Sequence, residues 1–177
     1  LIDHDQSEKL IGHDKVRGVT LTGSDGAGSI VGQQAAKAIK KSVLELGSND
    51  AFIVLEDADL ELAVETCTQA RLINNGETCV AAKRFIVVDS VYDEFRKRII
   101  EKFESKKAGD PMDKSSDFGP LARKDLQEKL HEQVEESVNK GATISVGGQL
   151  PAGKGSFYPA TILENVKKGQ PAYDDEL

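Results

Sequence analysis

Hydrophobic and polar positions along the chain switch repeatedly between the spacing of strands and the spacing of helices. Short strand-like runs predict strands at residues 17–23, 42–46, 51–55, 83–88, 143–146 and 158–163. Apolar residues three or four positions apart predict helices at residues 29–41, 57–72, 91–106 and 120–140. Because strands and helices alternate, the pattern favours an α/β fold with a mostly parallel sheet.

Apolar stripes within the predicted helices indicate which side chains form the core. Phe95, Ile99 and Phe103 recur four residues apart, as expected for one buried helical face. Cys67 lies on an apolar helical face, so we expect it to fill the core together with Leu60, Ala63, Val64 and Ala70. The helix over 120–140 has charged faces that we expect to be solvated and a narrow apolar stripe of Leu126, Leu130, Val134 and Val138.

The composition argues against several classes of function. The 177 residues include 30 acidic and 23 basic side chains, and the net charge of −7 disfavours nucleic acid as a partner. No long apolar stretch or signal peptide is visible, so we expect no membrane association and a cytoplasmic location. The scattered histidines and the two cysteines lack metal-site spacing, so we expect no metal and two thiols rather than a disulfide. Because the chain begins without methionine, we expect it to be a piece of a longer protein.

A glycine run from Gly23 to Gly28, "GSDGAG", connects a predicted strand to a predicted helix. Backbone N–H groups at such a turn and the start of a helix can face a phosphate. The order G-x-x-G-x-G differs from the usual dinucleotide fingerprint G-x-G-x-x-G. A cofactor-binding turn and a plain tight turn therefore both remain open for this segment.

Glu45 interrupts the apolar strand "SVLEL" and has three interpretations. It lies 22 residues after Gly23, near the spacing of an acid that binds a ribose hydroxyl. It could instead be a partly buried carboxylate suited to general-base work. The third interpretation is an exposed acid on an edge strand.

Cys79 follows the turn-forming stretch "NNGET" and precedes the basic pair of "AAKR". It is predicted to lie at the start of a short helical turn, where backbone amides favour a thiolate. Glu77 opposes this, because a neighbouring negative charge disfavours thiolate formation. From the residues alone, a nucleophile and an inert thiol are equally supported.

Three segments in order, "TGSDGAG", "LELGS" and "NNGETC", resemble the aldehyde dehydrogenase superfamily, whose patterns are roughly F-T-G-S-x-x-x-G, E-L-G-G and N-x-G-Q-x-C. The 34 residues from Glu45 to Cys79 match the interval that the family keeps between its base and its nucleophile. Smaller agreements, including "GDP" and "GPLARKDLQEKLHEQVEE", extend the resemblance over nearly the whole chain. The last of these, with "AAKR", is similar to bacterial succinate-semialdehyde dehydrogenases.

The resemblance implies a role for each matching residue. Cys79 would attack the aldehyde carbon to form a thiohemiacetal that becomes a thioester, and Glu45 would activate the water that hydrolyses it. The cofactor, NAD or NADP, would be bound by Gly23, Ser24, Gly28 and Leu46. The substrate would be a small aldehyde, with succinate semialdehyde favoured, and the full-length protein would be a homo-oligomer, either a dimer or a tetramer.

The resemblance also implies a domain boundary and leaves two rival functions. Residues 1–46 would be the C-terminal part of a Rossmann-like dinucleotide-binding domain, and residues 47–177 an incomplete catalytic domain that carries the nucleophile. A CoA-acylating family member is one rival. Two departures from the family pattern, Ser48 and Glu77, motivate the other, a catalytically silent relative that acts as a structural or interaction protein.

Overall fold

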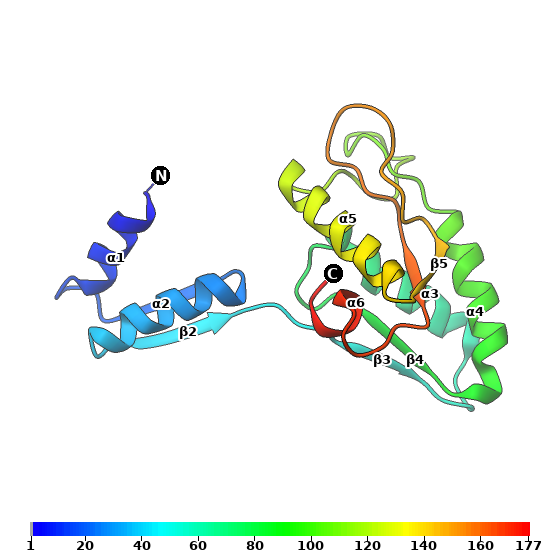
Figure 1. Cartoon of the computed structure of the whole chain (residues 1–177), viewed down its shortest axis with the longest axis horizontal. Helices are drawn as coiled ribbons and strands as arrows, with labels where there is room; N and C mark the ends of the chain where they lie inside the picture. Colours follow the sequence, from blue (N-terminus) through cyan, green and yellow to red (C-terminus); the bar gives the residue numbers. More distant parts are fainter. Residues whose placement is uncertain (1) are drawn as a thin grey trace. The chain divides into compact units, whose positions relative to one another are not determined.

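The structure contains two strand–helix–strand segments, and the two strands of each segment are parallel. The structure is a computed structural model and describes residues 2–177 (Figure 1). The chain divides into one unit that ends at Ser48 and a second unit from Asn49 to Leu177. The identity of these two units as nucleotide-binding and catalytic domains stays a prediction.

The first unit is built on a parallel pair of strands joined by a helix. Its elements are α1 (His4–Gly12), β1 (Gly18–Thr22), α2 (Asp25–Lys37) and β2 (Lys41–Glu45). The register pairs Gly18 with Lys41 and Thr22 with Glu45, so the carboxyl ends of both strands meet at one edge. A parallel pair requires a crossover, and α2 supplies it while packing on both strands (Figure 1).

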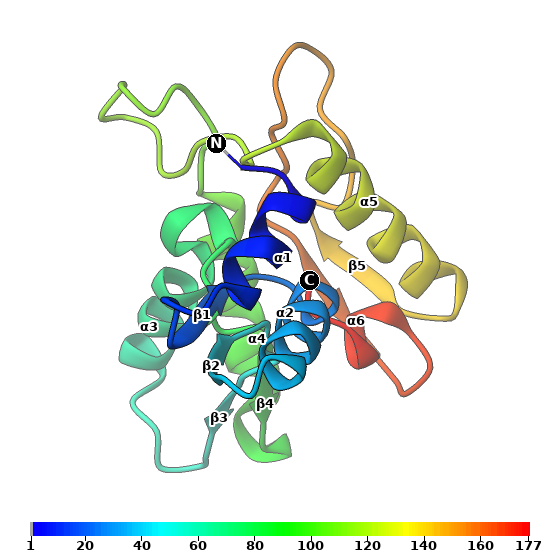
Figure 2. The ribbon, with the colours of Figure 1, turned by 90° about the vertical axis from the view of Figure 1, so that its left-hand side faces the viewer.

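The second unit repeats this arrangement and adds an antiparallel pair. The parallel pair is β3 (Ala51–Val54) and β4 (Arg84–Val87), with α3 (Leu60–Leu72) and the 3-10 turn η1 (Ile73–Gly76) between them. The elements that follow are α4 (Asp89–Glu104), α5 (Lys124–Asn139), β5 (Thr143–Val146), β6 (Ile162–Glu164) and α6 (Pro171–Asp174). Strands β5 and β6 are antiparallel, and the long loop between them stands above the unit (orange in Figures 1 and 2).

The core of the second unit is aliphatic and aromatic. Its buried members are Val54, Val64, Cys67, Phe95, Ile99 and Phe103. Phe95 also meets Phe85 edge to face, with ring centroids 6.2 Å apart. The prediction that Phe95, Ile99, Phe103 and Cys67 are core residues is therefore confirmed.

Several boundaries differ from those that the sequence pattern predicts. The sequence pattern predicts no helix before residue 17, but Asp3 and Gln6 form a capping box that starts helix α1. Helix α2 starts at Asp25 because Ser24 caps it, so most of the glycine run lies within its first turn. Helix α5 starts only at Lys124, four residues later than predicted.

Two polar side chains of α5 are buried, contrary to the prediction that only a narrow apolar stripe would be covered. Gln127 is 1% exposed and Ser137 is 0% exposed. Gln127 donates to the carbonyl of Phe157, and the Ser137 hydroxyl donates to the carbonyl of Gln133 at 2.7 Å. These bonds satisfy the buried polar groups, which is why the helix tolerates them inside.

From the sequence we expect neither a membrane-spanning segment nor a metal site, and the described residues can be compared with both expectations. None of the helices in residues 2–177 is long and apolar enough to cross a membrane. Within the same residues, no group of three or more His, Cys, Asp or Glu side chains is arranged to hold a metal ion.

Candidate active site

The loop that carries Cys79 has an unusual backbone. After α3, Asn74 and Asn75 adopt left-handed conformations with φ of 50° and 60°, and Gly76 follows with φ of 82°. A left-handed conformation costs a residue with a side chain about 1–2 kcal/mol, and asparagine is among the few that adopt it routinely. The sequence "NNG" therefore provides the residues that this turn requires.

Gly76 lies close to the end of α3. A Cβ atom there would lie 3.4 Å from the carbonyl oxygen of Arg71 and 3.7 Å from its guanidinium carbon. The last turn of α3 thus packs closely beneath the loop. Both distances are ordinary van der Waals distances, so the positive φ of 82°, and not lack of space, is what favours glycine at position 76.

Cys79 itself is exposed and lies in a single turn. The amide of Ala81 donates to the carbonyl of Thr78 at 2.9 Å, and the chain then continues into β4. The short helical turn predicted at Cys79 is thus a single hydrogen-bonded turn, and the chain does not continue from it into a longer helix.

Lys83 binds the Cys79 turn from its C-terminal side. Its ammonium group donates to the carbonyl oxygens of Cys79 at 2.5 Å and Thr78 at 3.3 Å. It also forms an ion pair with Glu176 at 2.8 Å, and its side chain is only 4% exposed. Lys83 therefore places a buried positive charge beside the backbone of Cys79.

The two cysteines are in opposite environments. Cys67 is 3% exposed within the core, and this burial raises the pKa of its thiol to about 11. At neutral pH it is therefore a protonated core side chain. Cys79 is exposed on a turn beside Lys83, so the structure separates a thiol that can meet a small molecule from one that cannot.

This contrast predicts unequal alkylation of the two thiols in the native protein. At pH 7, iodoacetamide should modify Cys79 at least about 100-fold faster than Cys67, because only an accessible thiolate reacts. Peptide mass spectrometry after timed quenching measures both rates in one sample. Equal rates for the two peptides would contradict the assignment of Cys79 as a reactive thiol.

The first unit gathers the remaining predicted site residues at one edge of its strand pair. Glu45 ends β2 and is exposed, and its carbonyl accepts a hydrogen bond from the Gly23 amide at 3.0 Å. Ser24 follows Gly23 and caps α2 through a 3.3 Å bond from the Ala27 amide. This edge, at the carboxyl ends of parallel strands and the start of a helix, is where open α/β sheets bind nucleotides.

Gly28 and Leu46 are in direct contact in this unit. A Cβ atom on Gly28 would lie 2.5 Å from one methyl carbon of Leu46 and 2.9 Å from the other. Gly28 is also buried. The glycine at this position therefore lets α2 approach the end of β2, which is a packing requirement independent of any cofactor.

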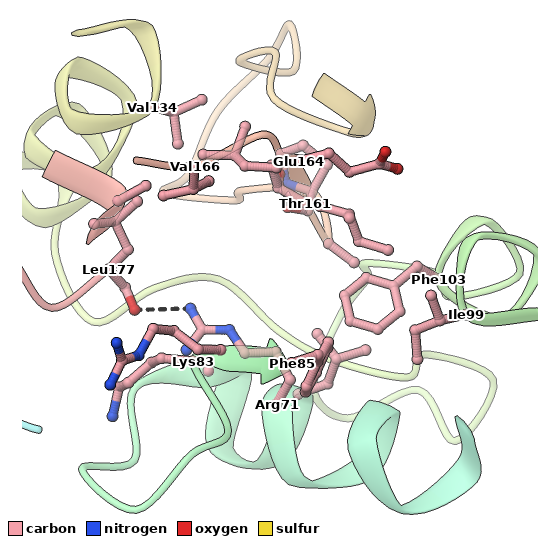
Figure 3. Close-up of a pocket in the computed structure, with 18 of the residues that line it drawn as sticks. Arg71, Lys83, Phe85, Ile99, Phe103, Val134, Thr161, Glu164, Val166 and Leu177 are labelled. Carbon is pink, nitrogen blue, oxygen red and sulfur yellow. Dashed lines mark hydrogen bonds between the residues drawn. The ribbon is translucent and has the colours of Figure 1, made fainter. Parts of the chain in front are cut away.

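A cavity of about 520 Å³ lies in the second unit, and Asn75, Gly76 and Lys83 of the Cys79 turn are among the residues that line it (Figure 3). Apolar side chains such as Phe85, Phe103 and Val134 form much of its wall, and none of the described residues that line it is a cysteine. Figure 3 shows the guanidinium group of Arg71 directed at the Leu177 carbonyl, to which it donates at 2.9 Å.

Among the ionisable groups that line this cavity, Glu164 is hydrogen-bonded to Arg96 and Ser145, whereas Nη1 of Arg71 is buried without a hydrogen-bond partner in the part of the chain that the structure describes. Burial acts to raise the pKa of the Glu164 carboxyl, but hydrogen bonds from Arg96 and Ser145 outweigh it and hold the pKa below its usual value. Burial lowers the pKa of Arg71, with the charge of Glu176 opposing it. The cavity walls thus carry no reactive thiol among the residues described, and Cys79 lies outside the lining.

Comparison with known protein families identifies the family to which the chain belongs. The model described as "Aldehyde dehydrogenase family" matches residues 3–177, nearly the whole chain. The chain belongs to the aldehyde dehydrogenase family.

Similar proteins include bacterial succinate-semialdehyde dehydrogenases. The succinate semialdehyde dehydrogenase [NAD(P)+] Sad of Escherichia coli is 44% identical over 175 residues, which are 99% of this chain and 38% of that protein. The NADP(+) enzyme of Deinococcus radiodurans is 44% identical over 170 residues, which are 96% of this chain and 36% of that protein. The chain therefore spans less than two fifths of the length of these relatives.

A solved structure supports the same fold. The crystal structure of succinic semialdehyde dehydrogenase from Streptococcus pyogenes, in complex with NADP+ as the cofactor, matches with a TM-score of 0.95 and 36% identity. The match covers 99% of this chain and 38% of that one. The predicted fold class, a truncated α/β aldehyde dehydrogenase-like chain with a mostly parallel sheet, is confirmed.

Sequence reasoning assigned no role to three residues that hold the Cys79 turn in this family member. From the sequence, Lys83 is only part of "AAKR", Asn75 is only a turn former, and Glu77 is a charge that disfavours a thiolate and a departure from the family pattern. Lys83 had one detectable signal, a lysine four residues after the candidate nucleophile at the entry to an apolar strand. The partners of Asn75 and Glu77 lie 44 and 45 residues away along the chain, beyond any local pattern.

Proposed function

We propose that the full-length protein oxidises an aldehyde to its carboxylic acid with NAD or NADP, with Cys79 as the nucleophile and succinate semialdehyde as the favoured substrate. The observation that carries this proposal is the exposed thiol of Cys79 on a turn held by Lys83 in a member of the aldehyde dehydrogenase family. The relatives named as succinate-semialdehyde dehydrogenases support the choice of substrate.

The proposed chemistry starts with a covalent bond from Cys79 to the substrate. The sulfur of the thiolate attacks the aldehyde carbon, and the carbonyl oxygen becomes the alkoxide of a thiohemiacetal. The backbone N–H of Cys79 itself is proposed to donate to that oxygen, since a fixed amide at the nucleophile stabilises a developing oxyanion. The turn would therefore position both the nucleophile and one oxyanion donor.

The cofactor is proposed to bind at the edge of the first unit formed by Gly23, Ser24, Gly28 and Leu46. The residues present fit a nucleotide there, because the carboxyl ends of β1 and β2 meet the start of α2 at this edge. When bound, NAD or NADP supplies the acceptor for the hydride that leaves the thiohemiacetal carbon, which converts the adduct on Cys79 into a thioester.

Glu45 is proposed to complete the cycle as a general base. Its carboxylate removes a proton from water, the resulting hydroxide adds to the thioester carbon, and the carboxylic acid leaves as the Cys79 thiolate is regenerated. The exposure of Glu45 at the end of β2 gives water access to the carboxylate within its own unit. The interpretation of Glu45 as a ribose ligand is set aside in this proposal.

The proposal is tested with the full-length protein and a small panel of substrates. Succinate semialdehyde and butanal, which has the same carbon number but no carboxylate, are each assayed with NAD and with NADP, in the presence and absence of CoA. We expect the highest kcat/KM with succinate semialdehyde and release of free succinate without CoA. A strict requirement for CoA would favour the acylating rival, and no reduction of either cofactor would favour a silent relative.

A further inference from the structure

The turn that carries Cys79 is attached to a segment far along the chain. The Asn75 side chain accepts a hydrogen bond from the Gly119 amide at 2.6 Å and donates one to the Pro120 carbonyl at 3.2 Å. The two oxygens of Glu77 lie 3.1 and 3.2 Å from the amide nitrogen of Ala122, which donates to that carboxylate. Side chains on both sides of Gly76 therefore bind backbone groups of Gly119, Pro120 and Ala122.

The segment 119–122 has a fixed position of its own. The Leu121 amide donates to the Ser156 carbonyl at 3.0 Å, and the Ser156 hydroxyl donates to the Leu121 carbonyl at 2.5 Å. A Cβ atom on Gly119 would lie 2.9 Å from a ring carbon of Pro111, so this backbone is closely packed. The segment can thus serve as a support against which the turn is held.

The contacts of Glu77 give this residue a use that the family resemblance does not provide. Its carboxylate accepts from Ala122, and its charge also helps to raise the pKa of the Arg123 guanidinium, after the larger effects of Asp125. The negative charge of Glu77, two residues before Cys79, therefore interacts with the Ala122 N–H and with the Arg123 guanidinium. A glutamine in this place would still offer one amide oxygen to Ala122.

We propose that Asn75 and Glu77 are positioning residues that hold the Cys79 turn against residues 119–122. We refer to these two side chains and their three hydrogen-bonded partners, Gly119, Pro120 and Ala122, as the clamp. The proposal rests on the proposed function of Cys79 for its catalytic consequence. The clamp acts from the N-terminal side of Cys79, and Lys83 acts from the C-terminal side, so the backbone that carries the thiol is held between two supports. An error of about 1 Å in a reacting group can cost about 100-fold in rate, which is why such supports matter.

The test compares Glu77→Ala with Glu77→Gln in the full-length enzyme. Glu104→Ala is the matched control, because Glu104 is an exposed carboxylate at the end of α4. We expect Glu77→Ala to lower kcat about tenfold while the KM for the aldehyde changes by less than about twofold, since the turn loses its fixed pose. Glu77→Gln should keep kcat within about threefold of the parent, because one acceptor for Ala122 remains.

Hydrogen exchange at the Ala122 amide measures the clamp without relying on catalysis. This amide should exchange at least about fivefold faster in Glu77→Ala than in the parent or in Glu104→Ala, because its acceptor is gone. Asn75→Asp provides a second variant, since it keeps the acceptor for Gly119 but cannot donate to Pro120. We expect it to lower kcat about threefold with an unchanged KM.

The possible failures are distinguishable. An inactive Cys79→Ser enzyme combined with full kcat and unchanged Ala122 exchange in Glu77→Ala would overturn the clamp alone. Equal losses of kcat in Glu77→Ala and Glu77→Gln would also overturn it, because the charge rather than the hydrogen bond would then matter. A fully active Cys79→Ser enzyme would remove the proposed function and, with it, the positioning role.

Discussion

Replacing Cys79 by serine in the full-length enzyme is expected to abolish aldehyde-dependent reduction of NAD or NADP, with a loss in kcat of at least about 1,000-fold. A serine hydroxyl has nearly the same size, but it is not ionised near neutral pH, and neither Lys83 nor the turn supplies a base for it. Steady-state absorbance of the reduced cofactor, with saturating aldehyde and cofactor, measures the effect.

The control for this variant is Cys67→Ala. Cys67 is buried in the core and packs among apolar side chains, so its truncation should lower stability while kcat stays within about twofold. If Cys79→Ser keeps more than a tenth of the parental kcat, Cys79 is not the nucleophile. Loss of activity in both variants would instead indicate a folding defect, which circular dichroism of each purified protein detects.

Replacing Glu45 by glutamine is expected to separate the two halves of the reaction. The first turnover should still reduce one equivalent of cofactor, because formation of the thioester does not need the base. Steady-state turnover should fall by about 100-fold or more, since hydrolysis then depends on unassisted water. Stopped-flow absorbance records the burst and the slow phase in one trace.

Glu8→Gln is the matched control for this variant, because Glu8 is an exposed carboxylate on α1 of the same unit. It should show neither a burst followed by a slow phase nor a reduced steady-state rate. A Glu45→Gln enzyme with parental turnover would exclude Glu45 as the base. A Glu45→Gln enzyme that shows no burst would place this residue before hydride loss rather than after it.

The sequence predicted the fold well where local patterns determine the structure. The order of β1, α2 and β2 followed from a strand run, a glycine-rich turn and helical spacing, and the buried face of α4 followed from Phe95, Ile99 and Phe103. Boundaries were less predictable where a cap or a distant partner determines them. Helix α2 begins earlier because Ser24 caps it, and α5 begins later because residues 119–122 bind Asn75 and Glu77 instead of entering the helix.

In the candidate site too, the residues within local motifs could be predicted and the contacts between distant residues could not. The ordered motifs marked Cys79 and Glu45, and exposure of Cys79 against burial of Cys67 agrees with the roles expected for the two thiols. The supports of the turn could not be predicted, because Lys83 acts through folding back on the carbonyl of Cys79 and Glu77 acts through a backbone amide 45 residues away. Such contacts depend on tertiary structure, which residue spacing does not encode.

Trapping the thioester tests the central claim most directly. Full-length Glu45→Gln enzyme is mixed with succinate semialdehyde and NADP, quenched in acid during the burst, digested and analysed by mass spectrometry. The account predicts one succinyl group on the peptide that contains Cys79, in an amount equal to the burst of reduced cofactor. A burst without an adduct on Cys79, or with the adduct on another residue, would contradict it.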